Sequence, residues 1–143
     1  PGNLSDQDVT RFRAGLVDVI PLLPRTLERL GVRVVNDDEM TQLHGRWKQQ
    51  ETTTDVVTFD LSDSSDGPLR VDIAVCLDEA FRQATARGHG SADELLLYVI
   101  HGLLHCCGHD DGDEASASAM HQEEDRLLQA IGRQPVYATG GES

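Results

Sequence analysis

The sequence is poor in lysine and in aromatic residues. Lys48 is the only lysine, and phenylalanine, tyrosine and tryptophan together make up 4% of the 143 residues. Proteins that bind single-stranded nucleic acid usually combine a basic groove with aromatic side chains on which the bases stack. The formal net charge of −13 also repels phosphates. The composition therefore argues against nonspecific binding of nucleic acid.

Long apolar runs and paired cysteine motifs are absent as well. No stretch of eighteen apolar residues occurs, so we expect no membrane partner. No basic segment followed by an apolar one opens the chain, so no export signal is visible. The chain begins with Pro1 and not with Met, as a trimmed piece of a longer product would.

The cysteines are few and badly spaced for a structural role. Cys76, Cys106 and Cys107 are odd in number, and none of them forms a CxxC motif. They therefore predict neither a disulfide framework nor a zinc ribbon. A chain with free thiols of this kind favours a reducing, cytoplasmic location.

The remaining pattern mixes helices and strands within one domain, residues 1–143, whose ends at 1–4 and 133–143 we expect to be flexible. Strands are expected over 30–35, 54–60 and 69–76, where β-prone or alternating residues occur. Helices are expected from Ser5 to about Val19, from Asn36 to about His44, over 78–87, from Ser91 to Cys107 and over about 120–131. The class is α/β or α+β, with a small mixed sheet.

The helix that begins at Ser91 differs from the others because it is apolar on nearly every side. Ser91 and Glu94 match the S-x-x-E capping box that starts many helices. A helix without a polar face belongs in the centre of a domain. We therefore predict a central buried helix, and Gly108 is expected to end it.

Two histidines on this helix indicate a metal site. His101 and His105 are four residues apart, so their side chains lie about 40° apart around the helix axis and on one face. Two imidazoles at this spacing can share one ion. A lone histidine would more often be a hydrogen-bonded core residue, but burying two without a strong partner is costly.

The third ligand is left open by the residues alone. Cys106 and Cys107 lie about 140° and 240° around the helix from His101 and are expected to be packing residues. The remaining candidates follow Gly108, namely His109, Asp110, Asp111 and, farther along, His121. Gly102 stands where a zincin peptidase carries its general-base glutamate. The chain therefore lacks that base, which argues against a peptidase of this kind.

The stretch "HGLLHCCGHDD", residues 101–111, resembles the H-G-x-L-H-x-x-G-x-D-H signature of the YbeY family of metal-dependent endoribonucleases. "VRVVNDDEMTQLH", "TTDVVTF" and "VDIAVC" are similar to further segments of that family, so the resemblance covers roughly residues 5–132. It implies a fold with one more strand, which would lie before Pro1. It also implies action on ribosomal RNA during ribosome maturation.

The resemblance implies a ligand set of His101, His105 and Asp111, with aspartate in place of the family's final histidine. His109 is the main rival for this third position, and Asp110 is expected to orient a histidine or the loop. A zinc ion, one per chain, is the expected cofactor, although a carboxylate ligand also suits other divalent ions.

The resemblance places Lys48 where the family usually has an arginine. Lysine keeps the positive charge but lacks the planar fork that grips a phosphate. Lys48 is equally consistent with an ordinary surface cation. We expect Lys48, His101 and His105 to act in catalysis, with the metal activating water against an RNA phosphodiester.

The expected partners are ribosomal or precursor RNA and the ribosome or a ribosome-associated protein. Acidic residues are dense near the motif, so we expect the RNA to be presented by a partner and not captured freely. The alternative hypothesis is a ribosome-associated assembly factor whose metal site is structural or lost. A general metallohydrolase acting on a small substrate or peptide is a third hypothesis, which Gly102 disfavours.

Overall fold

The structure is a computed structural model that describes residues 4–46, 51–52, 56–64, 67–108, 113–133 and 136. Lys48, His109, Asp110 and Asp111 lie outside these ranges, so the predictions made for them stay predictions. The same holds for most of the two ends expected to be flexible.

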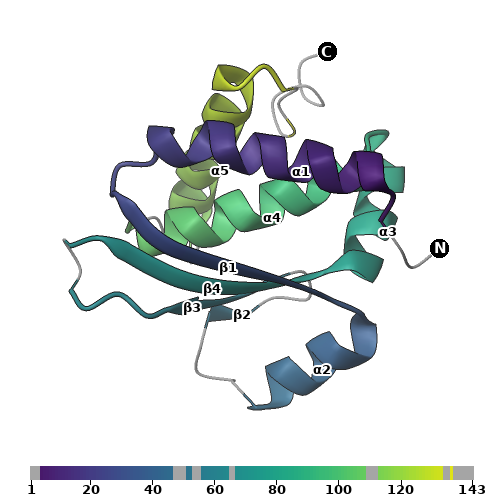
Figure 1. Ribbon diagram of the computed structural model, residues 1–143, viewed down its shortest axis with the longest axis horizontal. Helices are drawn as coiled ribbons and strands as arrows, with labels where there is room; N and C mark the ends of the chain where they lie inside the picture. The colour runs from purple at the N-terminus through teal and green to yellow at the C-terminus, as the bar shows by residue number, and fades with distance from the viewer. Residues whose placement is uncertain are drawn as a thin grey trace.

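The strands form one mixed sheet in the order β1-β4-β3-β2 (Figure 1). β1 (Leu27–Val35) runs parallel to β4 (Leu69–Cys76), and β3 (Val56–Asp60) runs antiparallel to β4. The two-residue β2 (Glu51–Thr52) pairs with β3. Within the described residues, β1 and β2 therefore form the two edges of the sheet.

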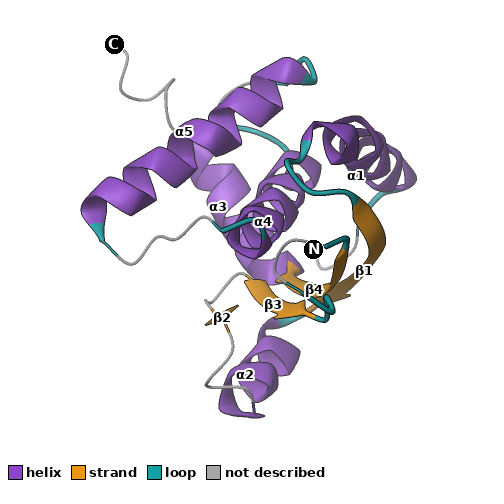
Figure 2. Cartoon of the chain, turned by 90° about the vertical axis from the view of Figure 1, so that its left-hand side faces the viewer, coloured by secondary structure: helices purple, strands orange, loops and turns teal. Residues whose placement is uncertain are grey.

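The helices cover the two faces of the sheet unequally (Figures 1 and 2). Three of them, α1 (Asp6–Val19), α4 (Ser91–Cys106) and α5 (Glu114–Ala130), lie on one side. α2 (Asp37–Arg46) lies on the other side, and α3 (Leu77–Arg87) follows the end of β4. A short 3-10 turn, Ile20–Leu22, leads from α1 toward β1. The predicted mixed α/β class is confirmed.

α4 is the central buried helix that the sequence predicts. Every residue from Leu95 to Ile100 is buried, and so are Gly102, Leu103 and Leu104. The helix packs on β3 and β4 below and against α1, α3 and α5 on its other sides. Each large apolar side chain buried in this way contributes about 1.5–3 kcal/mol to folding. No described helix combines the length and apolar character needed to cross a bilayer.

Two of the helix starts are stabilised by reciprocal side-chain caps. The Ser5 hydroxyl accepts a hydrogen bond from the Asp8 N–H, and the Asp8 carboxylate accepts one from the Ser5 N–H. Asn36 and Glu39 make the same reciprocal pair, with bonds of 2.9 and 3.0 Å. These local signals need only residues three apart, so they can be read from the chain.

The expected capping box at Ser91 and Glu94 is wrong. Gly90 is the N-cap of α4 and Ser91 is already helical, without a side-chain cap. Glu94 is fully buried, where it accepts a 2.7 Å hydrogen bond from Arg87 and lies 2.6 Å from Nε2 of His89. A buried carboxylate is costly without hydrogen-bonding partners, and Arg87 at the end of α3 and His89 in the turn after it supply them.

Candidate metal centre

His101 and His105 meet on one face of α4, near its C-terminal end. Their ring centroids are 4.7 Å apart, with the planes at 77° to each other. Both side chains are only partly buried, although the helix around them is deeply buried. The same-face prediction is therefore confirmed.

Glu124 of α5 orients the first of these histidines. Its Oε2 lies 2.7 Å from Nδ1 of His101, and the Glu124 side chain is fully buried. A carboxylate that is ionised only accepts hydrogen bonds, and with that partner the imidazole carries its proton at Nδ1. The lone pair of the other ring nitrogen, Nε2, is then directed away from Glu124, in the arrangement common to metal-binding histidines.

Glu124 was missed from the sequence, where Asp110 was expected to orient a histidine. The sequence does contain a weak signal for the role of Glu124. Glu124 is four residues after Met120 on the buried stripe of α5, next to Leu127 and Leu128. A carboxylate at a core position is rare without a partner. Its partner, however, lies 23 residues earlier on another helix.

The second oxygen of Glu124 supports a cation in this neighbourhood. Oε1 is buried and has no hydrogen-bond partner among the described residues. An isolated buried carboxylate oxygen is costly, and a nearby positive charge offsets that cost. Two imidazoles on one helix face, one of them hydrogen-bonded to a buried carboxylate, are ligand types that suit zinc or a similar divalent ion. The residues present therefore fit a metal.

Gly102 lets α4 approach the sheet closely beside the histidines. A methyl group at this position would lie 2.6 Å from Oγ1 of Thr58 on β3 and 3.0 Å from Cδ1 of Ile73 on β4. Thr58 is buried, and its branched side chain is stiff. Gly102 therefore serves the packing of α4 on β3 and β4.

We expect Gly102→Ala to lower the free energy of unfolding. Overpacking costs about 1–3 kcal/mol. We expect this cost to exceed the roughly 1 kcal/mol by which alanine favours a helix over glycine. Gly90→Ala is the matched control, because no atom lies within 4 Å of the added methyl group and we expect less than about 1 kcal/mol of change. Urea unfolding measures both. A Gly102→Ala protein more stable than the wild type would contradict the packing role.

The end of α4 is anchored from below by Arg25. Its guanidinium donates to the carbonyl of Cys106 at 2.8 Å and to the carbonyls of Ser64 and Gly67 at 2.7–3.0 Å. Gly108 follows with a φ of +100°, a backbone conformation that glycine adopts easily. The helix therefore ends at a fixed point, and the chain can turn there as expected.

The cysteines of the motif are packing residues, as the helical angles predict. Cys106 and Cys107 contact the main core cluster. Burial, with a smaller contribution from Asp60, raises the pKa of Cys106 to about 12. Burial also raises the pKa of Cys107. Both thiols are therefore poor thiolate ligands near neutral pH.

His121 keeps a place among the candidates for the third ligand. It lies on α5 three residues before Glu124, so the two side chains are neighbours on the helix surface. It is half-buried. Asp111, His109 and Asp110 lie outside the described residues, and the structure does not choose among the four.

A second group of possible ligand atoms lies at the far end of β4. Single ligand atoms of Asp37, Cys76 and Asp78 lie within 4.8 Å of one another. Arg82 already donates two hydrogen bonds to Asp37, at 2.8 and 3.0 Å, and holds the pKa of that carboxyl low. Asp78 accepts the Asp37 N–H. The Arg82 guanidinium thus takes the position that a metal cation would need. The group stabilises the first turn of α2.

Comparison with known proteins gives a consistent result. A family model described as endoribonuclease YbeY matches residues 8–132. The endoribonuclease YbeY of a Synechococcus strain is 39% identical over 106 residues, which are 70% of this chain and 66% of the relative. The one from Synechocystis is 33% identical over 139 residues, covering 90% and 76%.

A solved structure shares the fold. The solution structure of a Thermotoga maritima protein superimposes with a TM-score of 0.62 at 23% identity. The match covers 90% of this chain and 84% of that protein. At this identity the likeness supports the arrangement of helices and strands. It assigns no activity.

Proposed function

The chain belongs to the YbeY endoribonuclease family, and we propose that it is a metal-dependent endoribonuclease acting on ribosomal precursor RNA in the cytoplasm. The observation that carries this proposal is the pair His101 and His105, with Glu124 holding the first ring in the orientation of a ligand. Family membership alone does not say which residues of this chain would carry out the reaction.

We propose that His101, His105 and Asp111 hold one zinc ion per chain. When bound, the ion supplies a Lewis acid that activates water and polarises the scissile phosphate. Lys48 is proposed to offset the negative charge that develops on the phosphate. Glu124, hydrogen-bonded to Nδ1 of His101, is proposed to hold that ring with Nε2 directed away from Glu124.

The charge of the protein bears on how the substrate arrives. With a net charge of −13, the chain repels free RNA at a distance. We therefore propose that the ribosome or a ribosome-associated protein presents the RNA. Purified protein is expected to cut structured ribosomal RNA poorly, and to cut precursors in a ribosome-containing extract. Strong, salt-insensitive cutting of random RNA by the protein alone would contradict this.

The third ligand is tested by Asp111→Asn. An amide is a weaker ligand than a carboxylate, so we expect lower bound metal by elemental analysis and lower cleavage of precursor RNA in the extract. Asp113→Asn is the matched control, because asparagine caps a helix about as well as aspartate. Asp113 is the N-cap of α5 and accepts the Ser116 N–H. We expect that variant to keep its metal and activity.

Two further variants test the other candidates for the third ligand. Full metal content in Asp111→Asn would remove Asp111 from the site, and loss of metal in His109→Ala or His121→Ala would then identify the ligand. A wild-type protein that carries no metal but still associates with ribosomes would overturn the proposed nuclease function and favour the assembly-factor hypothesis. The aspartate at position 111, in place of a histidine, is the feature that favours this second function.

A further inference from the structure

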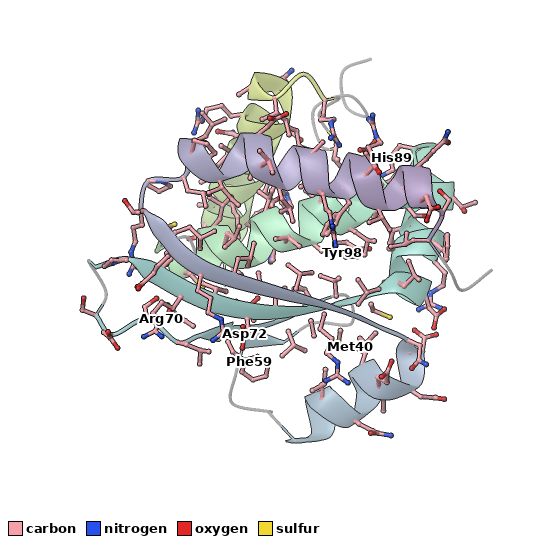
Figure 3. All side chains as sticks on the ribbon, in the orientation of Figure 1. Met40, Phe59, Arg70, Asp72, His89 and Tyr98 are labelled. Carbon is pink, nitrogen blue, oxygen red and sulfur yellow. The ribbon has the colours of Figure 1, made fainter. Side chains whose placement is uncertain are left out.

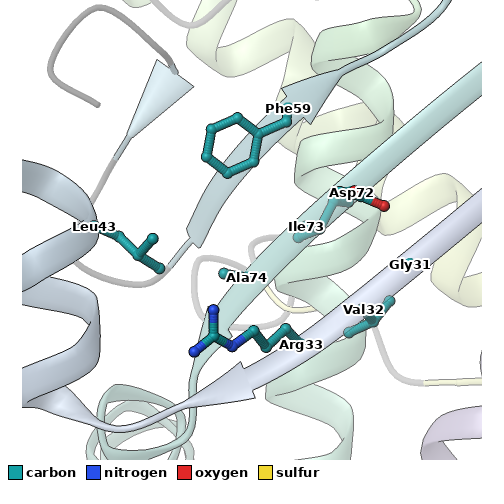
Figure 4. A pocket seen from close by; sticks show the side chains of 8 residues that line it. All are labelled: Gly31, Val32, Arg33, Leu43, Phe59, Asp72, Ile73 and Ala74. Carbon is teal, nitrogen blue, oxygen red and sulfur yellow. The ribbon is translucent and has the colours of Figure 1, made fainter. Parts of the chain in front are cut away.

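The two faces of the sheet differ in what they contribute to the histidine pair. Figure 3 shows Tyr98 on the side of α1 and α4, and Met40 and Phe59 on the side of α2. The α2 side has a hollow of about 330 Å³, and all of its lining residues belong to β1, β3, β4 and α2 (Figure 4). Arg33 at this hollow pairs with Glu39 of α2. Support for His101 comes from the other side, through α5.

α5 carries two consecutive buried acids. Glu124 is fully buried and Asp125 is 6% exposed. Successive helical residues project about 100° apart around the axis, so the two side chains leave α5 in different directions. Glu124 reaches His101 on α4, and Oδ1 of Asp125 accepts a 2.7 Å hydrogen bond from the N–H of Val136. One turn of α5 is thus bonded both to α4 and to the chain that follows α5.

Arg133 joins the end of α5 to two other helices, and this end lies near α1 (Figure 2). The Arg133 side chain is only 11% exposed. Nη1 donates to Oδ1 of Asp93 in the first turn of α4, and Nη2 donates to the backbone carbonyl of Arg11 on α1, each at 2.8 Å. Gly15 leaves room for the guanidinium, since a methyl group there would lie 3.0 Å from Nη2. An ion pair enclosed in this way is screened by salt less than an exposed one.

The backbone couples Arg133 to α5. Gly132 has a φ of +83°, and its N–H donates to the carbonyl of Gln129 at 3.0 Å. The N–H of Arg133 donates to the carbonyl of Leu128 at 2.8 Å. These two bonds form the Schellman motif that ends many helices. Glu124 lies one turn before Leu128, about 6 Å along the helix axis. A shift at Arg133 is therefore passed to α5 at Glu124.

Apolar packing leaves the rotation of α5 less well defined than these bonds do. Met120, Leu127 and Leu128 of α5 lie in the main core. The burial of apolar surface, however, has no preferred direction. The hydrogen bond between Glu124 and His101 needs a narrow range of distance and angle. A small rotation of α5 would break this bond while the apolar contacts are kept.

We propose that Arg133 is a positioning residue for the metal centre. Its bonds to Asp93 and to the Arg11 carbonyl fix the rotation of α5, and this rotation holds Glu124 against Nδ1 of His101. The inference rests on the proposed function, which makes His101 a metal ligand. Arg133 acts through Glu124 and takes no part in the chemistry itself.

Zinc affinity of the purified protein tests this role. Arg133→Gln is expected to bind zinc about 3- to 10-fold more weakly than wild type, a smaller loss than the roughly 10- to 100-fold that follows removal of an outer partner itself. Competition with a chromophoric chelator gives the dissociation constant.

Arg11→Gln is the matched control for this experiment. The Arg11 side chain donates two hydrogen bonds to the same Asp93, at 2.9 and 3.0 Å. Arg133 uses only the backbone carbonyl of Arg11, which glutamine keeps. The control therefore removes a contact between α1 and α4 without releasing the end of α5. We expect a lower melting temperature and the zinc affinity of the wild type.

A second readout in metal-free protein separates positioning from general stability. The proton on Nδ1 of His101 gives an NMR signal as long as Glu124 protects it from exchange with water. We expect this signal in the wild type and in Arg11→Gln, and its loss in Arg133→Gln, at a temperature where all three proteins are folded by circular dichroism. Either a retained signal or an unchanged zinc affinity in Arg133→Gln would overturn the positioning role.

A milder variant covers the case in which Arg133→Gln does not fold. Arg133→Lys keeps the charge but lacks the planar fork with which arginine reaches two acceptors. We expect it to show a weaker Nδ1 signal and a weaker zinc affinity than the wild type. Wild-type values for both would count against the proposal.

The outcomes also separate this inference from the proposed activity. Cleavage of precursor RNA by the wild type, with equal zinc affinity in Arg133→Gln, would overturn the positioning role and leave the nuclease. Weaker zinc binding and a lost ring signal in Arg133→Gln, with no cleavage of any precursor by the wild type, would support the positioning role and overturn the nuclease. A wild type that binds no divalent ion would overturn both.

Discussion

His105→Ala is expected to abolish metal binding and RNA cleavage together. The imidazole lies 4.7 Å from that of His101 and is proposed as a direct ligand. Loss of an outer partner of a ligand already costs about 10- to 100-fold in affinity or activity. Loss of the ligand itself is expected to exceed this. Elemental analysis and cleavage of precursor RNA in a ribosome-containing extract measure the two effects.

The fold is expected to survive this change. His105 is only partly buried and lies in the last turn of α4. His105→Gln retains much of the side-chain volume without the imidazole, so it separates ligation from packing if the alanine variant is unstable. Both variants should lose metal. A protein that keeps its full metal content without His105 would move the ion to another site, such as Asp37 and Asp78.

Glu124→Gln is expected to weaken metal binding by about 10- to 100-fold. The amide carries no charge to strengthen the hydrogen bond from Nδ1 of His101, and it also removes the buried negative Oε1. The ring becomes a poorer ligand although every direct ligand is still present. Competition with a chromophoric chelator gives the metal dissociation constant.

Glu123→Gln is the matched control for this experiment. Glu123 is the neighbouring residue, but it pairs with the exposed Arg126 on the same helix. Its loss is expected to cost less than about 1 kcal/mol of stability and to leave metal affinity unchanged. Equal metal affinities in the two glutamine variants would show that Glu124 only packs. A similar melting temperature for the metal-free forms would exclude general unfolding as the cause.

The sequence was most informative where a structural feature depends on residues close in the chain. The spacing of His101 and His105 requires a shared face once the segment is helical. The alternation at Val71, Ile73 and Val75 likewise requires one buried face of a strand. The reciprocal caps at Ser5 and Asn36 span only three residues. The shared histidine face was expected and is confirmed, and all three features depend on local backbone geometry alone.

The sequence was less informative where the partner is distant in the chain. Glu94 looked like a capping residue, but in the core it accepts a hydrogen bond from Arg87 and lies 2.6 Å from Nε2 of His89. β1 begins at Leu27, earlier than expected, because Leu27 pairs with Leu69 across the sheet. In both cases a tertiary contact is stronger than the local preference.

The sequence by itself determined the mixed α/β class, the buried central helix, the two histidines on one face and the YbeY family. Only the tertiary structure placed Glu124 against His101, because the packing of α5 on α4 brings together groups that are 23 residues apart. It also showed why position 102 is glycine, through the contact with Thr58.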